Sequence, residues 1–274
     1  MARAFSLSLA LAFLFAGIVS ARDWNILNQL RLRAQNDAVE TAGGENGGLS
    51  ASSLKGYCES WRINVEMHNI RDFVVVPQEC VAHVKRYMTS SQYEDDVERA
   101  VDEVALYLAS SCCSKKQCDG MDAWVFDVDD TLLSTIPYHK SNGFFGGEVL
   151  NATKFEEWMG KSKAPAVPHM KRLYHEIRKR GIKIFLVSSR KEYLRSATVD
   201  NLIQQGYYGW SNLLLRGLED EKKQVRQYKA EMRTWLASQG YRIWGVMGDQ
   251  WNSFAGCPSP KRTFKLPNSI YYVA

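Results

Sequence analysis

The stretch WVFDVDDTLLST, residues 124–135, places three aspartates at the end of an apolar run. Residues 123–128 are typical of a buried strand, and Asp127, Asp129 and Asp130 lie at or just beyond its end. Like charges crowded at the tip of a buried strand are costly unless a cation or a reaction uses them. The stretch therefore predicts a functional site whose other components come from elsewhere in the chain.

Further apolar runs alternate with amphipathic helices along the chain. Strands are expected at 182–189, 212–216, 242–249 and 262–266. Apolar residues at helical spacing predict helices at 92–110, 168–180 and 222–239, the last two closed by Gly181 and Gly240. Continuous apolar strands between helices are typical of a parallel sheet covered on both faces. The predicted fold class is α/β, a Rossmann-like parallel sheet flanked by helices.

Polar residues follow three of these strands at their carboxyl ends. They are Asp127 to Asp129, Ser188 to Arg190, and Asp249. Ligands of open α/β sheets bind in the crevice at this edge of the sheet. We therefore expect carboxylates, a hydroxyl and an arginine around one crevice. The insert at about 132–167, after the first strand, is rich in Pro, Gly and aromatic residues, which predicts a small loop-rich or helical cap over the crevice mouth.

The first 21 residues have the pattern of a secretory signal peptide. Arg3 precedes an apolar core, and Val19-Ser20-Ala21 is a small-residue cleavage signal. Residues 22–55 are rich in Gly, Ser and Ala, which predicts a flexible leader before a folded part at 56–274. No later segment has the ~20 uninterrupted apolar residues of a membrane span. We expect entry into the secretory pathway without membrane association after cleavage, with the cell exterior and the vacuole left open.

The cysteines and the charge are consistent with an exported chain. An even number of cysteines in such a chain favours disulfides, although six allow 15 pairings; they are Cys58, Cys80, Cys112, Cys113, Cys118 and Cys257. Asn151 begins an N-glycosylation sequon, Asn-Ala-Thr. The net charge of +5 falls to +4 without Arg3, and the basic residues are spread out, so nothing indicates nucleic-acid binding.

Four short motifs occur in an order that resembles a known superfamily. DVDDT at 127–131 fits the D-x-D-x-T signature of haloacid dehalogenase-like phosphatases, and Ser188, Lys229 and GDQWNS at 248–253 follow in the same order. SSRKEYLRSATVDNLIQQGY, GYRIWGVMGDQW and KRTFKLPNSIYY are similar to the plant acid phosphatase and vegetative storage protein family. The resemblance spans most of 56–274.

This resemblance implies a role for each motif residue. Asp127 would be the nucleophile that forms an aspartyl-phosphate, and Asp129 the general acid and base. Lys229 would neutralise charge on the transferring group, and Ser188 would bind a phosphoryl oxygen. Mg²⁺ would be held by Asp127, the backbone carbonyl of Asp129 and Asp249. The implied activity is acid phosphatase action on a small phosphorylated substrate.

Several residues have a second interpretation. Arg190 either contacts phosphate or pairs with an acid, and Asp130 either caps the next helix or is exposed. Without the motif order, Lys229 would be taken for a solvated surface lysine. Cap aromatic and histidine side chains either contact the leaving group or pack in the cap; they are Tyr138, His139, Phe144, Phe145 and Trp158.

Two positions depart from the family pattern. Ser253 stands where a second aspartate is common, which would weaken the outer-shell support of Mg²⁺. Ser189 stands where glycine is usual, and its side chain could crowd the phosphate or strain a turn. These departures keep a second hypothesis open, that of a vegetative storage protein with little or no activity. Whether the protein forms a homodimer is also left open.

Overall fold

A computed structural model describes residues 51–111 and 119–274. The predicted signal peptide, most of the predicted leader, and Cys112, Cys113 and Cys118 lie outside the described residues. One compact unit spans Lys55–Ala274 and contains the whole sheet.

The sheet has five strands in the order β3-β2-β1-β4-β5, and every pair is parallel. The strands are β1 (Asp122–Phe126), β2 (Lys183–Lys191), β3 (Asn212–Arg216), β4 (Arg242–Gly248) and β5 (Arg262–Lys265). The predicted fold class is confirmed, and each strand lies within a few residues of its predicted position. The central strand β1 is buried along its whole length, which explains its unbroken apolar sequence.

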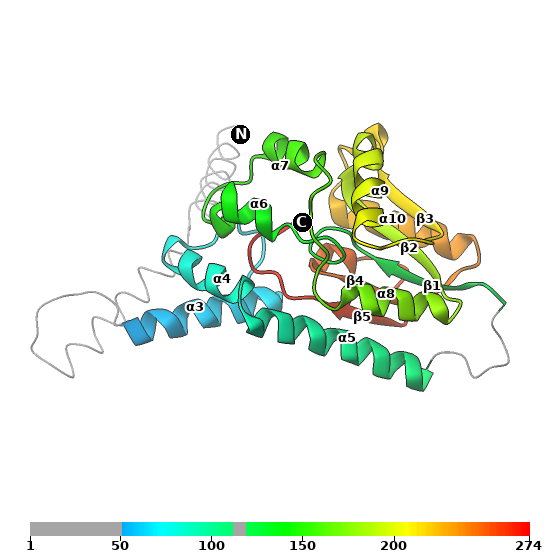
Figure 1. Cartoon of the computed structure of the whole chain (residues 1–274), viewed down its shortest axis with the longest axis horizontal. Helices are drawn as coiled ribbons and strands as arrows, with labels where there is room; N and C mark the ends of the chain where they lie inside the picture. Colours follow the sequence, from blue (N-terminus) through cyan, green and yellow to red (C-terminus); the bar gives the residue numbers. More distant parts are fainter. Residues whose placement is uncertain (1–50, 112–118) are drawn as a thin grey trace, which may run out of the picture. The chain divides into compact units, whose positions relative to one another are not determined.

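Helices cover both faces of the sheet (Figure 1). α5 (Ser91–Ser111) and α8 (Met170–Lys179) pack on one face, and α10 (Val225–Ser238) packs on the other. The side chains of β1 alternate between these layers: Phe126 stacks on Tyr174 of α8, whereas Val125 shares a buried cluster with the α10 residues. The three helices predicted from periodicity are therefore confirmed as the covering layers.

The positions of the other α-helices of the described residues were not predicted, although a helical contribution to the cap was expected. These helices are α3 (Ala51–Glu66), α4 (Val81–Met88), α6 (Ile136–Ser141), α7 (Ala152–Met159) and α9 (Arg195–Gln204). α3 begins inside the predicted leader, and a Cys58–Cys80 disulfide joins it to the segment before α4. α9 lacks a clear apolar stripe because it buries the polar residues Thr198 and Asn201 beside Leu202.

The segment between β1 and α8 contains α6 and α7 and is closed at its base by hydrogen bonds. The N–H of Ser134 donates to the carbonyl of Pro165 at 2.7 Å, and the N–H of Val167 donates to the carbonyl of Leu132 at 2.9 Å. The Asn201 side chain of α9 bonds both the N–H and the carbonyl of Ala164. These bonds hold the two ends of the insert side by side above the sheet.

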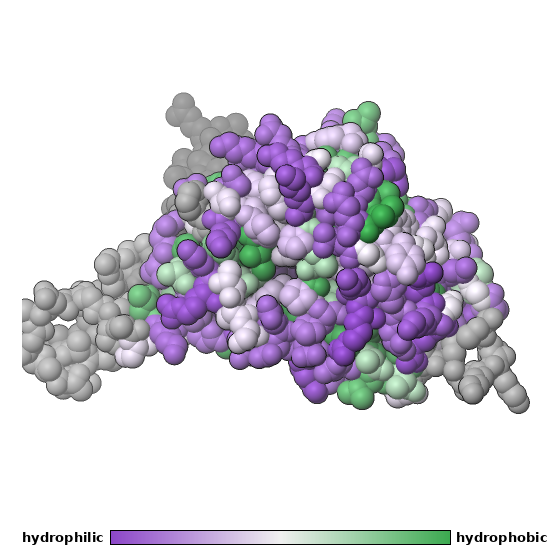
Figure 2. Space-filling model, in the orientation of Figure 1, coloured by the Kyte–Doolittle hydropathy of each residue, from purple (hydrophilic) through white to green (hydrophobic). Residues whose placement is uncertain are grey.

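In the part of the chain that the structure describes, no helix is long and apolar enough to cross a membrane. On the face seen in Figure 2, hydrophilic residues dominate and hydrophobic residues form small separate groups.

Gly245 of β4 lies opposite Trp124 of β1, and the fully buried indole ring fills the space where a side chain would be. A Cβ at this position would lie 2.3 Å from two ring carbons. We expect Gly245→Ala to lower the free energy of unfolding by about 1–3 kcal/mol, the usual cost of overpacking a core. Urea denaturation with an unchanged m-value would measure this loss.

Gly56→Ala is the matched control, because no atom lies within 4 Å of the added methyl group on α3. It should be neutral or stabilising by up to about 1 kcal/mol. Equal free energies of unfolding for the two variants would contradict the packing argument.

Candidate active site

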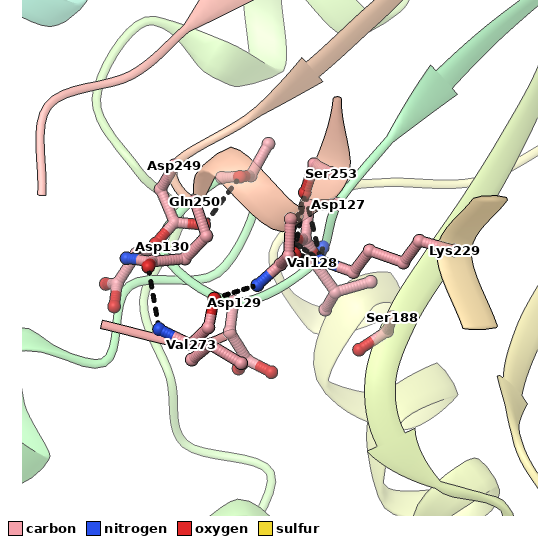
Figure 3. A network of polar contacts seen from close by, with 12 residues as sticks. Asp127, Val128, Asp129, Asp130, Ser188, Lys229, Asp249, Gln250, Ser253 and Val273 are labelled. Carbon is pink, nitrogen blue, oxygen red and sulfur yellow. Dashed lines mark hydrogen bonds and ion pairs between the residues drawn. The ribbon is translucent and has the colours of Figure 1, made fainter. Parts of the chain in front are cut away.

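Asp127 lies directly after β1, where its N–H donates to the carbonyl of Met247 on β4 at 3.0 Å. Its carboxylate is 6% exposed and accepts three hydrogen bonds. Oδ1 accepts from the N–H of Val128 at 2.7 Å, and Oδ2 accepts from the hydroxyl of Ser253 at 3.0 Å and from the ammonium of Lys229. Figure 3 shows Lys229 extended toward Asp127, with Ser253 beside the pair.

Lys229 is buried on α10 and is 3% exposed, so the interpretation as a surface lysine is wrong. Besides Asp127, its ammonium donates to Asn252 Oδ1 at 2.8 Å and to Ser253 Oγ at 2.9 Å. These three acceptors use all three of its hydrogens. One helical turn later, the buried Arg233 donates to the carbonyl of Ser253 at 2.7 Å. Two cations of α10 therefore position the turn that carries Ser253.

Asp129 forms a two-contact ion pair with Arg190. Arg190 Nη2 lies 2.7 Å from Oδ1, and Nε lies 3.0 Å from Oδ2. The guanidinium is fully buried and also donates to Thr198 Oγ1 at 3.1 Å. Of the two interpretations of Arg190, the structure shows the pairing with an acid.

Asp130 is fully buried, so the expectation of exposure is wrong. Its carboxylate accepts from the N–H of Thr135 at 2.7 Å, from the hydroxyl of Thr135, and from the hydroxyl of Tyr271 at 2.7 Å. Thr135 is itself the N-cap residue of α6, so Asp130 supports that helix only through Thr135. Burial raises the pKa of Asp130 to about 6 despite these donors.

Asp249 follows β4 and is also buried. Its Oδ2 accepts from Asn268 Nδ2 at 2.7 Å, Gln250 Nε2 at 3.1 Å and the Tyr271 hydroxyl at 3.3 Å. Its Oδ1 has one contact, with Thr131 Oγ1 at 3.5 Å. Burial, followed by repulsion from Asp127 and from Asp130, raises the pKa of Asp249 to about 7.

Ser188 and Ser189 lie at the end of β2. The Ser188 hydroxyl is buried and accepts from the N–H of Arg190 at 3.1 Å, which leaves its hydrogen free to donate. Since Phe126 pairs with Leu186, Ser188 lies level with the residues just beyond β1. Ser189 has no positive φ and continues the strand, so the prediction of a strained turn is wrong.

A cavity of about 290 Å³ opens above this edge of the sheet. Its wall combines strand ends, cap and C-terminal residues, among them Asp129, Ser189, Arg190, His139, Phe155 and Tyr271. Asp127 and Lys229 line a separate space of about 10 Å³. The Asp127–Lys229 ion pair therefore does not line the larger cavity, whereas Asp129, two residues after Asp127, does.

Among the predicted cap candidates, His139 lines this cavity, and burial lowers its pKa to about 4. Neither ring nitrogen has a hydrogen-bond partner, and the ring stacks on Tyr271. Tyr138 packs against Phe155 and Trp158, and Phe145 is buried, so the cap-core interpretation holds for Tyr138, Phe145 and Trp158. The side chain of Phe144 lies outside the described part.

The donor set suits a hard divalent cation. The buried Asp249 lies close enough to Asp127 and to Asp130 to be repelled by both, whereas Lys229 is a buried cation that touches Asp127. Carboxylate and carbonyl oxygens are the ligands that Mg²⁺ prefers. The described residues contain no group of three His, Cys, Asp or Glu side chains arranged around one point. The predicted set needs only two carboxylates, with a backbone carbonyl as the third ligand, so it remains compatible.

Sequence reasoning missed the C-terminal residues of the site. Asn268 and Tyr271 contact buried acids, and Gln250 links the loop after β4 to the carbonyl of Tyr271 at 3.2 Å. The segment KRTFKLPNSIYY carried a family resemblance but no chemical motif. Only the tertiary structure shows that these residues reach the acids.

A five-stranded parallel sheet with an insert after β1 and clustered aspartates at its carboxyl edge defines a haloacid dehalogenase-like phosphatase. Residues 47–274 match the family described as HAD superfamily, subfamily IIIB (Acid phosphatase). The chain belongs to this acid phosphatase family.

Similar proteins include both enzymes and storage proteins. "Acid phosphatase 1" of Solanum lycopersicum is 40% identical over 79% of this chain and 83% of that protein. "Vegetative storage protein 2" of Arabidopsis thaliana is 38% identical over 79% of this chain and 80% of that protein. The structure of the class C acid phosphatase from Bacillus anthracis shares the fold, with a TM-score of 0.59 and 22% identity over 71% of this chain and 86% of that one.

The raised pKa of Asp249 predicts a pH-dependent stability. In the metal-free protein, the pKa of Asp249 is about 7, whereas its ordinary value in the unfolded chain is 3.8. At pH values between these two, the folded state binds a proton at Asp249 more tightly than the unfolded chain does. Stability from this group is present at low pH and is lost as the pH rises through that window. We therefore expect the chelated wild type to lose stability relative to Asp249→Asn as the pH rises.

Urea denaturation of both proteins in chelator, at several pH values across the window, measures this difference. The comparison cancels contributions from groups that do not interact with Asp249, such as His139, whose lowered pKa acts in the opposite direction. A difference between the two proteins that does not change with pH would contradict the expectation.

Proposed function

We propose that this protein hydrolyses phosphate monoesters of small molecules through an aspartyl-phosphate on Asp127. The observation that carries the proposal is the buried contact between Asp127 and Lys229 at the end of the central strand. A carboxylate and an ammonium that are both desolvated in this way are costly as a purely structural pair. The cavity of about 290 Å³ whose wall includes Asp129 and Ser189 suits a small phosphorylated ligand.

In the first half-reaction, a carboxylate oxygen of Asp127 bonds to phosphorus as the bond to the leaving oxygen breaks. Asp129 gives its proton to that oxygen and later takes a proton from the water that attacks the aspartyl-phosphate. The second attack releases phosphate and regenerates Asp127. In the ion pair with Arg190, Oδ2 of Asp129 contacts only Nε of Arg190. We therefore assign Oδ2 as the oxygen that carries the transferred proton.

The surrounding residues supply charge and orientation. Lys229 offsets negative charge on Asp127 and on the transferring phosphoryl group. The free hydrogen of Ser188 donates to a phosphoryl oxygen. Asp127, the Asp129 backbone carbonyl and Asp249 would hold Mg²⁺, which neutralises phosphate charge when bound.

A storage role with little turnover is the second candidate. Ser253 supports it, because its hydroxyl places a second donor on the same Asp127 oxygen that Lys229 contacts. Bonds of this kind stabilise the resting carboxylate and must loosen before it attacks phosphorus. The intact Asp127, Lys229 and Asp249 favour the enzyme.

Asp127→Asn should abolish hydrolysis of a generic phosphate monoester, because the amide is a poor nucleophile and cannot form the acyl phosphate. Wild type should be active with Mg²⁺ and should lose activity in chelator. Steady-state rates of the purified mature protein measure both effects.

Asp200→Asn is the control, since Asp200 is an exposed acid on α9, and it should retain the wild-type rate. Melting temperatures should show that Asp127→Asn remains folded. Equal residual rates for Asp127→Asn and wild type would overturn the proposal.

We also propose that the protein enters the secretory pathway, for secretion or the vacuole, and carries a glycan at Asn151. The Cys58–Cys80 disulfide supports this route because disulfides persist in oxidising compartments. Asn151 is exposed, and its Oδ1 caps α7 by accepting from the N–H of Lys154 at 3.0 Å. This bond leaves Nδ2 available for the glycan.

Thr153→Ala should remove the glycan while the Asn151 cap remains, because Thr153 is exposed and is needed only for the sequon. The plant-expressed wild type should shift in electrophoretic mobility after deglycosylation, and the variant should not. A wild type that shows no shift would exclude the use of Asn151.

A further inference from the structure

The C-terminal tail, residues 266–274, runs from β5 back to the loop after β4. The N–H of Leu266 donates to the carbonyl of Gly248 at 2.9 Å. Further along, Asn252 Nδ2 donates to the carbonyl of Val273 at 2.9 Å, and the N–H of Val273 donates to Gln250 Oε1 at 3.1 Å. The tail is therefore attached to this loop at both of its ends.

Between these attachment points, two tail side chains contact Asp249. Asn268 Nδ2 lies 2.7 Å from Asp249 Oδ2, and the Tyr271 hydroxyl lies 3.3 Å from the same oxygen. Both contacts are with one oxygen, whereas among the described residues Oδ1 has only the contact at 3.5 Å with Thr131. The tail thus occupies one side of the carboxylate and leaves the other oxygen available.

The orientation of the Asn268 amide follows from its other contacts. Its Oδ1 accepts from the N–H of Ile270 at 2.9 Å, so Nδ2 must be the atom that faces Asp249. The backbone N–H of Asn268 donates to Glu66 Oε1 at 2.8 Å, which positions the residue from α3. Asn268 is 1% exposed, so this donor is fixed in place before any ligand arrives.

Ser253 does not perform this task. Its hydroxyl contacts Asp127 and Lys229, and no hydrogen bond joins it to Asp249 among the described residues. This agrees with the expectation that Ser253 in place of an aspartate gives weaker outer-shell support. Any support of Asp249 in this chain comes from other residues.

We propose that Asn268 and Tyr271 are positioning residues for Asp249, and that they orient its Oδ1 toward the cation of the active site. This inference rests on the proposed Mg²⁺-dependent function. Donors on the outer oxygen of a metal carboxylate hold its free oxygen in the binding geometry and favour its ionised form. The tail thereby supplies the outer-shell support that an aspartate at position 253 would give in other members of the family.

Tyr271 has a second effect on the same site. Its hydroxyl has one hydrogen and lies 2.7 Å from Asp130 Oδ2, closer than to Asp249. The phenol therefore separates two buried acids that repel each other. Removing the hydroxyl takes one donor from Asp130, which keeps both Thr135 donors, and it takes from Asp249 the polar group that lies between the two acids.

The test compares Tyr271→Phe with Tyr272→Phe, two adjacent tail residues that each lose one hydroxyl. Tyr272 contacts His68 at 3.4 Å and touches neither acid in the described structure. Calorimetric titration with MgCl₂ alone should give about tenfold weaker binding for Tyr271→Phe, as for other outer-shell changes, and wild-type affinity for Tyr272→Phe. The turnover number of Tyr271→Phe on a generic phosphate monoester should recover at saturating Mg²⁺.

Asn268→Asp is the second variant. It keeps the acceptor for Ile270 and replaces the donor to Asp249 with a repelling oxygen, so its Mg²⁺ affinity should fall by about tenfold or more. Melting temperatures without Mg²⁺ identify any variant that fails to fold. If both Tyr271→Phe and Asn268→Asp fold and bind Mg²⁺ with wild-type affinity, the inference is overturned and the proposed function is unaffected. A wild type that binds no Mg²⁺ would overturn both the inference and the metal requirement of the proposed function.

Discussion

The repulsion among buried carboxylates at the carboxyl end of β1 and β4 is the constraint on which the site depends. Asp127, Asp130 and Asp249 are all buried, and the charges of Asp127 and Asp130 both reach Asp249. A buried charge is tolerated only when partners and hydrogen bonds compensate for its lost hydration. Each acid must therefore be matched by donors from another part of the fold.

Each acid is compensated by a different segment. Lys229 reaches Asp127 from α10, Thr135 serves Asp130 from the start of the cap, and the C-terminal tail serves Asp249. Asp129, at the cavity wall, has its own partner in Arg190 at the end of β2. Helix, cap, neighbouring strand and tail consequently converge at one edge of the sheet. Oδ1 of Asp249, whose only contact among the described residues is 3.5 Å long, is left available for a cation.

Parts of this arrangement could be predicted from local patterns. The strands and the three covering helices were predictable because burial on both faces demands apolar runs, and packing on one face demands helical periodicity. α9 was not predictable, because its buried face includes the polar residues Thr198 and Asn201. Thr198 accepts from Arg190 of β2, and Asn201 bonds Ala164 on the insert. Asp130 was assigned to the wrong environment because nothing in DVDDT distinguishes a solvated turn from one covered by Tyr271.

The sequence by itself determined the parallel sheet and the position of the aspartates at its edge, since both follow from residue order along one strand. It also determined the family, through motifs that each occupy a few adjacent positions. Only the tertiary structure decided the partners: Lys229 meets a carboxylate 102 positions earlier, and Tyr271 meets one 141 positions earlier. Hydrogen bonds depend on distance and direction between atoms, and for residues so far apart these are set by the packing of the whole unit.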